Sequence, residues 1–78
     1  MLVIRYLIKD VIDHSYLGNN YDINGRLKFM PLNWAHEFKT ISAVEGEIES
    51  VLDEYRSKTL TIETIYRWTS NEYKKKEN

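Results

Sequence analysis

The sequence predicts a small α+β domain, a two-layer sandwich in which one amphipathic helix covers one face of an about four-stranded, mainly antiparallel sheet. Three observations lead to this fold class. The chain has only 78 residues, one segment has apolar residues at helical spacing, and the first and last apolar segments alternate as strands do. We expect residues 1–70 to form a single domain and residues 71–78 a frayed, charged tail.

Composition excludes several classes of protein. The chain has no cysteine and two histidines, so neither a disulfide nor a structural zinc site is expected. Charged residues interrupt the apolar N-terminal segment, and no run approaches the roughly 18 apolar residues of a membrane span. We therefore expect a cytoplasmic protein without a signal peptide and without membrane contact.

The first element is expected to be a strand over residues 2–9. Its even positions are all apolar and its odd positions are mixed, as in a strand with one buried face. A helix through residues 1–12 is the rival interpretation. The β-branched and aromatic residues of this segment favour the strand.

A hairpin is expected after a polar stretch, Asp13–Asn20, because Asn24-Gly25 lies between two short apolar runs. A two-residue loop would send Leu27 to the solvent face. A three-residue loop over 23–25 places Tyr21 opposite Leu27 and Gly25 in a left-handed conformation. We prefer the three-residue loop, because a slip of one residue moves every side chain to the other face.

Pro31 is expected to end the second hairpin strand, since proline cannot donate to a strand ladder. The segment Leu32–Phe38 is too short for a helix of its own. We expect it to form a single turn that brings Trp34, Ala35 and Phe38 to the edge of the core.

The helix is expected over residues 43–56. Ser42 and Glu45 have the spacing of a capping box, in which each side chain bonds the other residue's backbone N–H. The helical apolar stripe consists of Val44, Ile48, Val51, Leu52 and Tyr55.

A final strand is expected to begin at Leu60, after a short break. Its residues alternate between two faces through Trp68, and residues 69–78 lack apolar periodicity. A thin core needs large side chains, so we expect six aromatic residues on buried faces: Tyr6, Tyr21, Phe29, Tyr55, Tyr66 and Trp68.

No catalytic, metal-binding or cofactor-binding motif is present in the sequence. Asp10, Asp13 and His14 form the nearest cluster, and polar residues are ordinary where a strand runs into a loop. A chain of this size also has little room for a pocket of about 300 Å³ beside its core. We expect a protein that is not an enzyme and that uses no cofactor.

Charge is concentrated in the helix. Residues 43–56 contain five acidic residues and one basic residue, a net charge of −4. Glu45, Glu49 and Asp53 recur along one flank, and Glu47 and Glu54 lie on the other. The helix dipole favours acid near a helix start, so a solvated face is one interpretation. Like charges four residues apart are destabilising, however. We interpret the face as a docking surface for a basic partner protein, such as a nucleic-acid-binding enzyme, with Trp34 as a further candidate contact.

Direct nucleic-acid binding is the alternative function. Aromatic residues make up 13% of the chain, and lysines 74–76 could contact phosphates. A sequence pI of about 6.1 argues against it, because a basic surface would be expected. A homo-oligomer is a third possibility, because the core is thin.

Three parts of the chain resemble small accessory proteins of phages and prophages of low-GC Gram-positive bacteria. They are Trp34-Ala35-His36-Glu37-Phe38-Lys39-Thr40, the acidic helix, and the closing Leu60-Thr61-Ile62-Glu63-Thr64-Ile65-Tyr66. These proteins often show an Ala-x-x-Phe-x-Ser/Thr segment, an acidic helix and a terminal strand of the I-x-x-I-Y kind. The resemblance covers residues 34–66, and Val44-Glu45-Gly46 departs from the Glu-Glu-Ala often found there. It implies a non-enzymatic phage protein that binds a host protein in the host cytoplasm, including inhibitors of host defence such as anti-CRISPR proteins.

Overall fold

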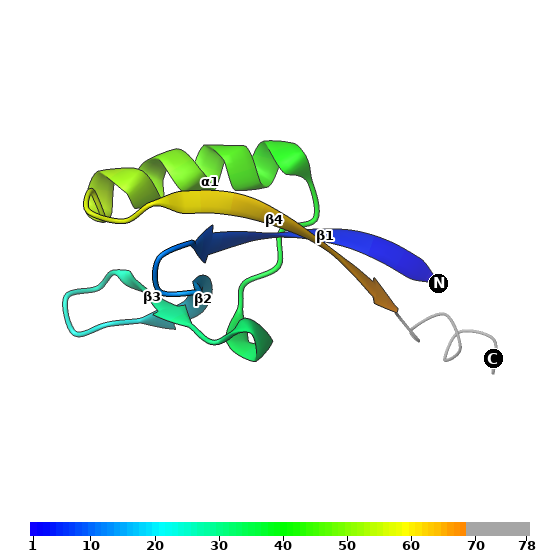
Figure 1. The fold of residues 1–78 in the computed structure, drawn as a ribbon, viewed down its shortest axis with the longest axis horizontal. Helices are drawn as coiled ribbons and strands as arrows, with labels where there is room; N and C mark the ends of the chain where they lie inside the picture. The colour runs from blue at the N-terminus through cyan, green and yellow to red at the C-terminus, as the bar shows by residue number, and fades with distance from the viewer. Residues whose placement is uncertain (69–78) are drawn as a thin grey trace.

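The computed structural model describes residues 1–68 and has the expected fold class, a four-stranded antiparallel sheet with one helix (Figure 1). The elements are β1 (Leu2–Asp10), β2 (Ser15–Tyr21), β3 (Leu27–Met30), a short 3₁₀ turn (Leu32–Trp34), α1 (Ile41–Glu54) and β4 (Leu60–Trp68). The strand order is β3-β2-β1-β4, so β3 and β4 form the two edges of the sheet. The proposed domain end at residue 70 and the tail 71–78 lie outside the described residues.

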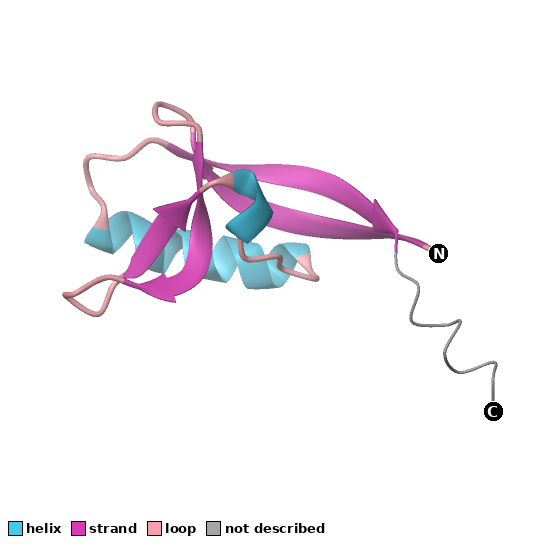
Figure 2. Ribbon diagram, turned by 90° about the horizontal axis from the view of Figure 1, so that it is seen from below, coloured by secondary structure: helices cyan, strands magenta, loops and turns pink. Residues whose placement is uncertain are grey.

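β1 and β4 form a long two-stranded ribbon. Their register is continuous from Leu2 opposite Trp68 to Asp10 opposite Leu60. On its other side β1 pairs with β2 only at Lys9 and Asp10. We call residues 6–10 and 60–64 the inner half of the ribbon and residues 2–5 and 65–68 its outer half. The inner half is part of the full sheet, whereas the outer half projects beyond the helix and the hairpin (Figure 2).

The chain before the helix fills the place that β2 leaves beside β1. Phe38 exchanges two backbone hydrogen bonds with Tyr6, of 2.9 and 2.8 Å. Phe38 is itself buried, and α1 begins three residues later, at Ile41. This short bridge fixes the point along the ribbon at which the helix begins.

The core lies between α1 and the inner half of the sheet. Its buried members come from every layer: Ile8, Leu17, Phe38, Val44 and Val51. Ile48, Tyr55 and Ile62 pack against them and are partly buried. The predicted apolar stripe of the helix is thus the face that covers the sheet, apart from Leu52, which is exposed.

The three-residue hairpin loop is confirmed. Tyr21 is opposite Leu27, and Gly25 has a positive φ of 78°. The Asp22 carboxylate stabilises the turn by accepting hydrogen bonds from the Asn24 and Arg26 N–H groups, at 2.8 and 3.0 Å.

The first hairpin strand begins earlier than expected, and the prediction of a polar loop through Asn20 is wrong. β2 starts at Ser15, and Tyr16 and Leu17 are buried. Gly18 lies inside this strand because the backbone of residues 34–35 crosses it closely. A Cβ at Gly18 would lie 2.5 Å from the Met30 Cγ and 3.2 Å from the Trp34 carbonyl oxygen.

The helix also begins earlier, and the predicted capping box is wrong. Thr40 is the N-cap, with an extended backbone and a side-chain oxygen that accepts from the Ala43 N–H at 3.2 Å. Because Phe38 is held against β1, the chain turns two residues before Ser42. Ser42 therefore lies in the first helical turn.

Burial was predicted correctly for only some of the aromatic residues. Tyr6, Phe29 and Tyr55 are partly buried and pack against the core. Tyr21, Tyr66 and Trp68 are exposed, at 67, 65 and 72%. Tyr66 and Trp68 share the face that carries the helix, but they lie on the outer half of the ribbon, beyond the point at which the helix begins.

The single turn predicted after Pro31 is confirmed as the 3₁₀ turn, but the three residues expected at the core edge differ in burial. Phe38 reaches the core and Ala35 is partly buried, but the expectation that Trp34 lies at the core edge is wrong, because its side chain is 60% exposed. Within residues 1–68, no helix has the length and the apolar character needed to cross a membrane.

Candidate protein-binding surfaces

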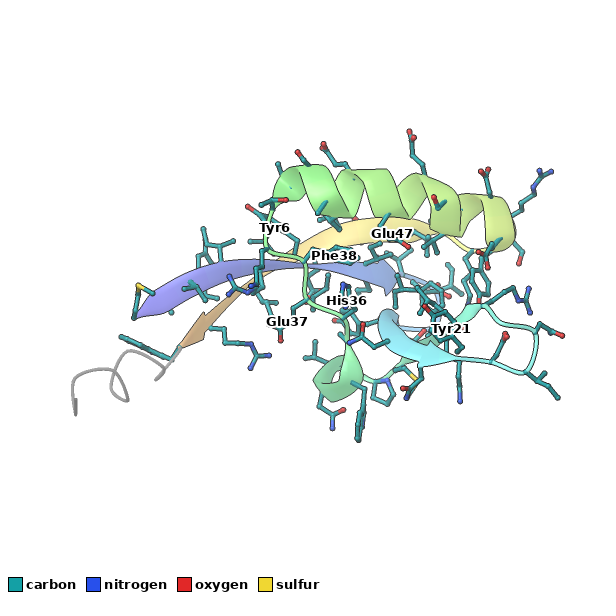
Figure 3. All side chains as sticks on the ribbon, turned by 180° about the vertical axis from the view of Figure 1, so that it is seen from behind. Tyr6, Tyr21, His36, Glu37, Phe38 and Glu47 are labelled. Atoms are coloured by element: carbon teal, nitrogen blue, oxygen red, sulfur yellow. The ribbon has the colours of Figure 1, made fainter. Side chains whose placement is uncertain are left out.

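The five carboxylates of α1 form what we call the acidic helix surface. Glu45, Glu49, Asp53 and Glu54 are exposed. Glu47 is partly buried on the flank that faces the hairpin, where it lines a hollow with Tyr21 and Leu27 (Figure 3). Figure 3 also shows oxygen-tipped side chains projecting from the helix away from the sheet.

No carboxylate of the acidic helix surface has a cationic partner within 4 Å among the described residues. The other described acidic residues all have one. Asp10 and Asp13 pair with Lys58, Asp22 with Arg26, Glu37 with Arg67, and Glu63 with Lys9. Within residues 1–68, the fold thus pairs every acidic group with a cation except those on this helix.

The helix dipole does not account for the acidic residues. The first turn of α1 contains no acidic residue, because the helix begins at Ile41. Asp53 and Glu54 lie in the last turn, where the free carbonyl groups make negative charge unfavourable. No basic residue of the last turn compensates them. Both the interaction of Asp53 and Glu54 with the helix dipole and the repulsion between like charges along the helix therefore reduce the stability of the fold.

A second surface is an open apolar groove of about 660 Å³ on the opposite face of the sheet. Leu7 and Ile65 form its floor, and Pro31, Leu32 and Asn33 form a wall. The expectation that the chain has little room for such a pocket is wrong. The 3₁₀ turn stands beside the ribbon rather than on it, and a groove remains between them.

One charged pair lies at the groove. The Arg67 guanidinium holds the Glu37 carboxylate with two contacts, and the Nε–H donates to Oε1 at 2.9 Å. This pair joins the outer ribbon to the segment before the helix. None of the described residues that line the groove is a histidine, serine, threonine or lysine. The groove can therefore hold an apolar group, and the one carboxylate in its described lining, Glu37, is held by Arg67.

The Asp10 cluster is a structural centre. Asp10 is 2% exposed, and its carboxylate accepts from the Ile12 and Asp13 N–H groups and from the Lys58 ammonium, the last at 2.8 Å. The hydrogen bond from Lys58 lowers the pKa of Asp10 below its usual value and raises the pKa of Lys58. The cluster ties the β1–β2 turn to the loop before β4.

The clustering expected of Asp10, Asp13 and His14 is only partly present. The two aspartates share Lys58, whereas His14 adopts a left-handed backbone with φ of 59°. No group of three or more histidine or acidic residues suited to a metal ion occurs in residues 1–68.

Tyr16 links β2 to β4. Its hydroxyl group donates to the Glu63 carboxylate at 3.1 Å, and burial, followed by this hydrogen bond, raises the pKa of Tyr16.

Comparison with known proteins found no matching family model, curated protein or solved structure.

Among the candidate residues, the structure groups the helix carboxylates and separates them from Trp34. Trp34 lies on the 3₁₀ turn, beside β2 rather than beside α1. Sequence reasoning missed the apolar groove, whose lining comes from three separate segments. It also missed the exposed outer half of the ribbon. β1 and β4 pair over nine residues each, but the helix begins only after Phe38, which lies beside Tyr6 in the middle of β1, so the helix cannot cover the whole ribbon.

Proposed function

We propose that this chain is a non-enzymatic protein-binding module that docks its acidic helix surface on a basic surface of a partner protein. One observation carries the proposal. Five carboxylates gather on one helix without a cation within 4 Å in the described part of the chain, while each of the other five described carboxylates is paired. A surface that costs folding free energy and is left unneutralised is typical of a site that a partner neutralises.

The resemblance of residues 34–66 to phage accessory proteins supports a more specific role. In this role the chain is a phage-type inhibitor or modulator of a host protein, acting in the cytoplasm of the host cell. A nucleic-acid-binding enzyme fits as the partner, because such enzymes have basic surfaces where the phosphate backbone binds. Anti-CRISPR proteins and other inhibitors of host defence belong to this class.

The test replaces two exposed carboxylates that take no part in capping, Glu49→Lys and Asp53→Lys together. The immobilised wild-type chain is used to capture a partner from lysate, and the affinity of that identified partner is then measured for each variant. We expect the double variant to lose binding, and we expect wild-type association to slow as salt rises. The fold should be retained, because the substitution removes repulsion between like charges.

The matched control is Ser42→Lys with Ser50→Lys, which adds two lysines to exposed positions of the same helix and keeps all five carboxylates. It should bind more weakly than the wild type but far better than the carboxylate variant. If the carboxylate variant binds the captured partner with wild-type affinity, the acidic helix surface is not the interface.

A second candidate function, nucleic-acid binding, is favoured by the exposure of Tyr66 and Trp68, whose rings are open to stacking. Salt-sensitive retention of the chain on a nucleic-acid column would support it. Under the first proposal the chain passes through the column at physiological salt.

A further inference from the structure

Among residues 1–68, no strand pairs with the outer edge of β4. β4 is the last strand of the sheet, and its nine residues pair with β1 without any break in register. Tyr6 directs its backbone groups to Phe38, so the even residues of β1 face away from β4. By alternation, the even residues of β4, such as Thr64 and Tyr66, direct their N–H and C=O groups outward.

The two edges of the sheet are protected very differently. β3 has four residues, is followed by Pro31 and carries the exposed Lys28, which are features that prevent pairing with another chain. β4 has nine residues without proline, glycine, lysine or a bulge. A strand of this length, whose only charged residues are Glu63 and Arg67, is suited to accept a strand that offers charges complementary to them.

The charges of β4 select one register in which the strand complements itself. When two β4 strands run antiparallel with Ile65 opposite Ile65, Glu63 of each copy lies opposite Arg67 of the other. No other antiparallel register places these two charges opposite each other. In this register Thr64 and Tyr66 of the two copies form the hydrogen-bonded pairs, as the outward direction of their backbone groups requires.

The same register covers the exposed aromatic residues. Trp68 of each copy lies opposite Ile62 of the other, and Tyr66 lies opposite Thr64, which are favourable aromatic and β-branched cross-strand pairs. Since the flank of α1 with Glu47 and Glu54 faces the hairpin, the opposite flank faces β4. That flank carries Ile41 and Leu52, which are exposed large apolar residues.

We propose that two copies of this chain pair through β4, antiparallel and centred on Ile65, to form one continuous eight-stranded sheet. The two copies are related by a two-fold axis perpendicular to the sheet. Rotation about this axis leaves each face of the sheet on the same side, so both helices lie on one face of the eight-stranded sheet. Each helix then lies beside the outer aromatic residues of the other copy. The dimer goes beyond the proposed function, because it uses an edge that the acidic helix surface does not include.

The test measures the mass of the wild-type chain by analytical ultracentrifugation over a range of concentrations. We expect the weight-average mass to rise from 9.3 kDa toward twice that value. Glu63→Arg or Arg67→Glu alone places like charges opposite each other twice in the dimer and should weaken association about tenfold. The double variant Glu63→Arg/Arg67→Glu restores opposite charges and should recover association.

The double variant also separates dimerisation from monomer stability. It loses both ion pairs within the chain, Glu63 with Lys9 and Arg67 with Glu37, so an effect through monomer stability would make it the weakest of the three. Recovery of association is expected only if the two residues meet across the interface. Circular dichroism of each variant checks that it is folded.

A backbone variant provides the second measurement. Thr64→Pro removes an N–H group that points outward and is not needed by the monomer, so the variant should fold and remain monomeric. Its matched control, Thr64→Val, keeps the N–H group and should dimerise as the wild type does. A wild-type mass that stays at 9.3 kDa up to millimolar protein overturns the proposal. So does a dimer that is insensitive to both the charge series and Thr64→Pro.

Discussion

Substitution of Gly25 and of Gly46 by alanine tests the same side chain in two different backbone conformations. A Cβ would meet no atom within 4 Å at either position, but Gly25 has φ of +78° and Gly46 is helical. We expect Gly25→Ala to lower the free energy of unfolding by about 1 kcal/mol, because an L side chain resists positive φ. Gly46→Ala should raise it by about 0.5–1 kcal/mol. Urea denaturation measures both, and changes of the same sign would contradict the assigned turn.

Asp10→Ala removes the acceptor of three hydrogen bonds and leaves the Lys58 ammonium without its closest partner. We expect the free energy of unfolding at neutral pH to fall by about 2–3 kcal/mol, somewhat less than for a fully buried pair because Lys58 is 20% exposed. Asp13→Ala is the control, since its contact with Lys58 is longer, at 3.7 Å, and its side chain is exposed. Equal losses for the two variants would show that the buried carboxylate has no special role.

The pH dependence of stability tests the same carboxylate. Its pKa is lower in the folded chain than its usual value of 3.8, so its contribution to stability is complete above that value. The contribution is lost as the pH falls through the lower, folded pKa. We therefore expect the difference in unfolding free energy between the wild type and Asp10→Ala to shrink in acid, below the usual carboxyl range. A difference that stays constant down to pH values well below 3.8 would contradict this assignment.

At the scale of single elements, the helix start provides a comparison of two neighbouring hydroxyl residues. Thr40 caps the helix and Ser42 lies inside its first turn. Thr40→Ala should lower the melting temperature and cost about 1 kcal/mol, whereas Ser42→Ala should change the stability by less than about 0.5 kcal/mol. The opposite order would restore the capping box that the sequence predicts.

Elements whose pattern is local were predictable. The hairpin loop followed from the parity of Tyr21 and Leu27, and the helical stripe followed from spacing alone. β2 was missed because Gly18 is a turn signal in the sequence. Its actual cause is the close approach of a segment sixteen residues away, at Trp34. Such a contact between distant segments leaves no periodic trace in either one.

The acidic helix surface also has one property that the sequence predicts and one that only the fold determines. The number and spacing of the helix carboxylates can be counted in the sequence. Whether each one is neutralised depends on cations brought close by the fold, as Arg67 is brought to Glu37 from thirty residues away. That the carboxylates of α1 have no cationic partner within residues 1–68, the observation behind the proposed function, could therefore be seen only in the structure.

At the scale of the whole molecule, the ribbon should differ in stability along its length. The amides of Leu7 and Glu63 lie in the inner half, which α1 and Phe38 cover, while those of Val3 and Arg67 lie in the outer half. We expect hydrogen exchange at low protein concentration to be at least about tenfold slower for the inner pair. Uniform exchange along the ribbon would show that the outer half is held as firmly as the sheet.

The pairing of β1 with β4 also determines when the chain can fold during its synthesis. β1 is made first, and its full-length partner is about fifty residues later, so a ribosome working at about 5–20 residues per second completes β4 several seconds after β1. The hairpin and the helix can form in that interval, because their contacts are local. The apolar residues of β1 stay without a partner strand until β4 has left the ribosome. Folding of the sheet is therefore a late event, and a nascent chain stalled before residue 60 exposes the strand that the finished protein places at its centre.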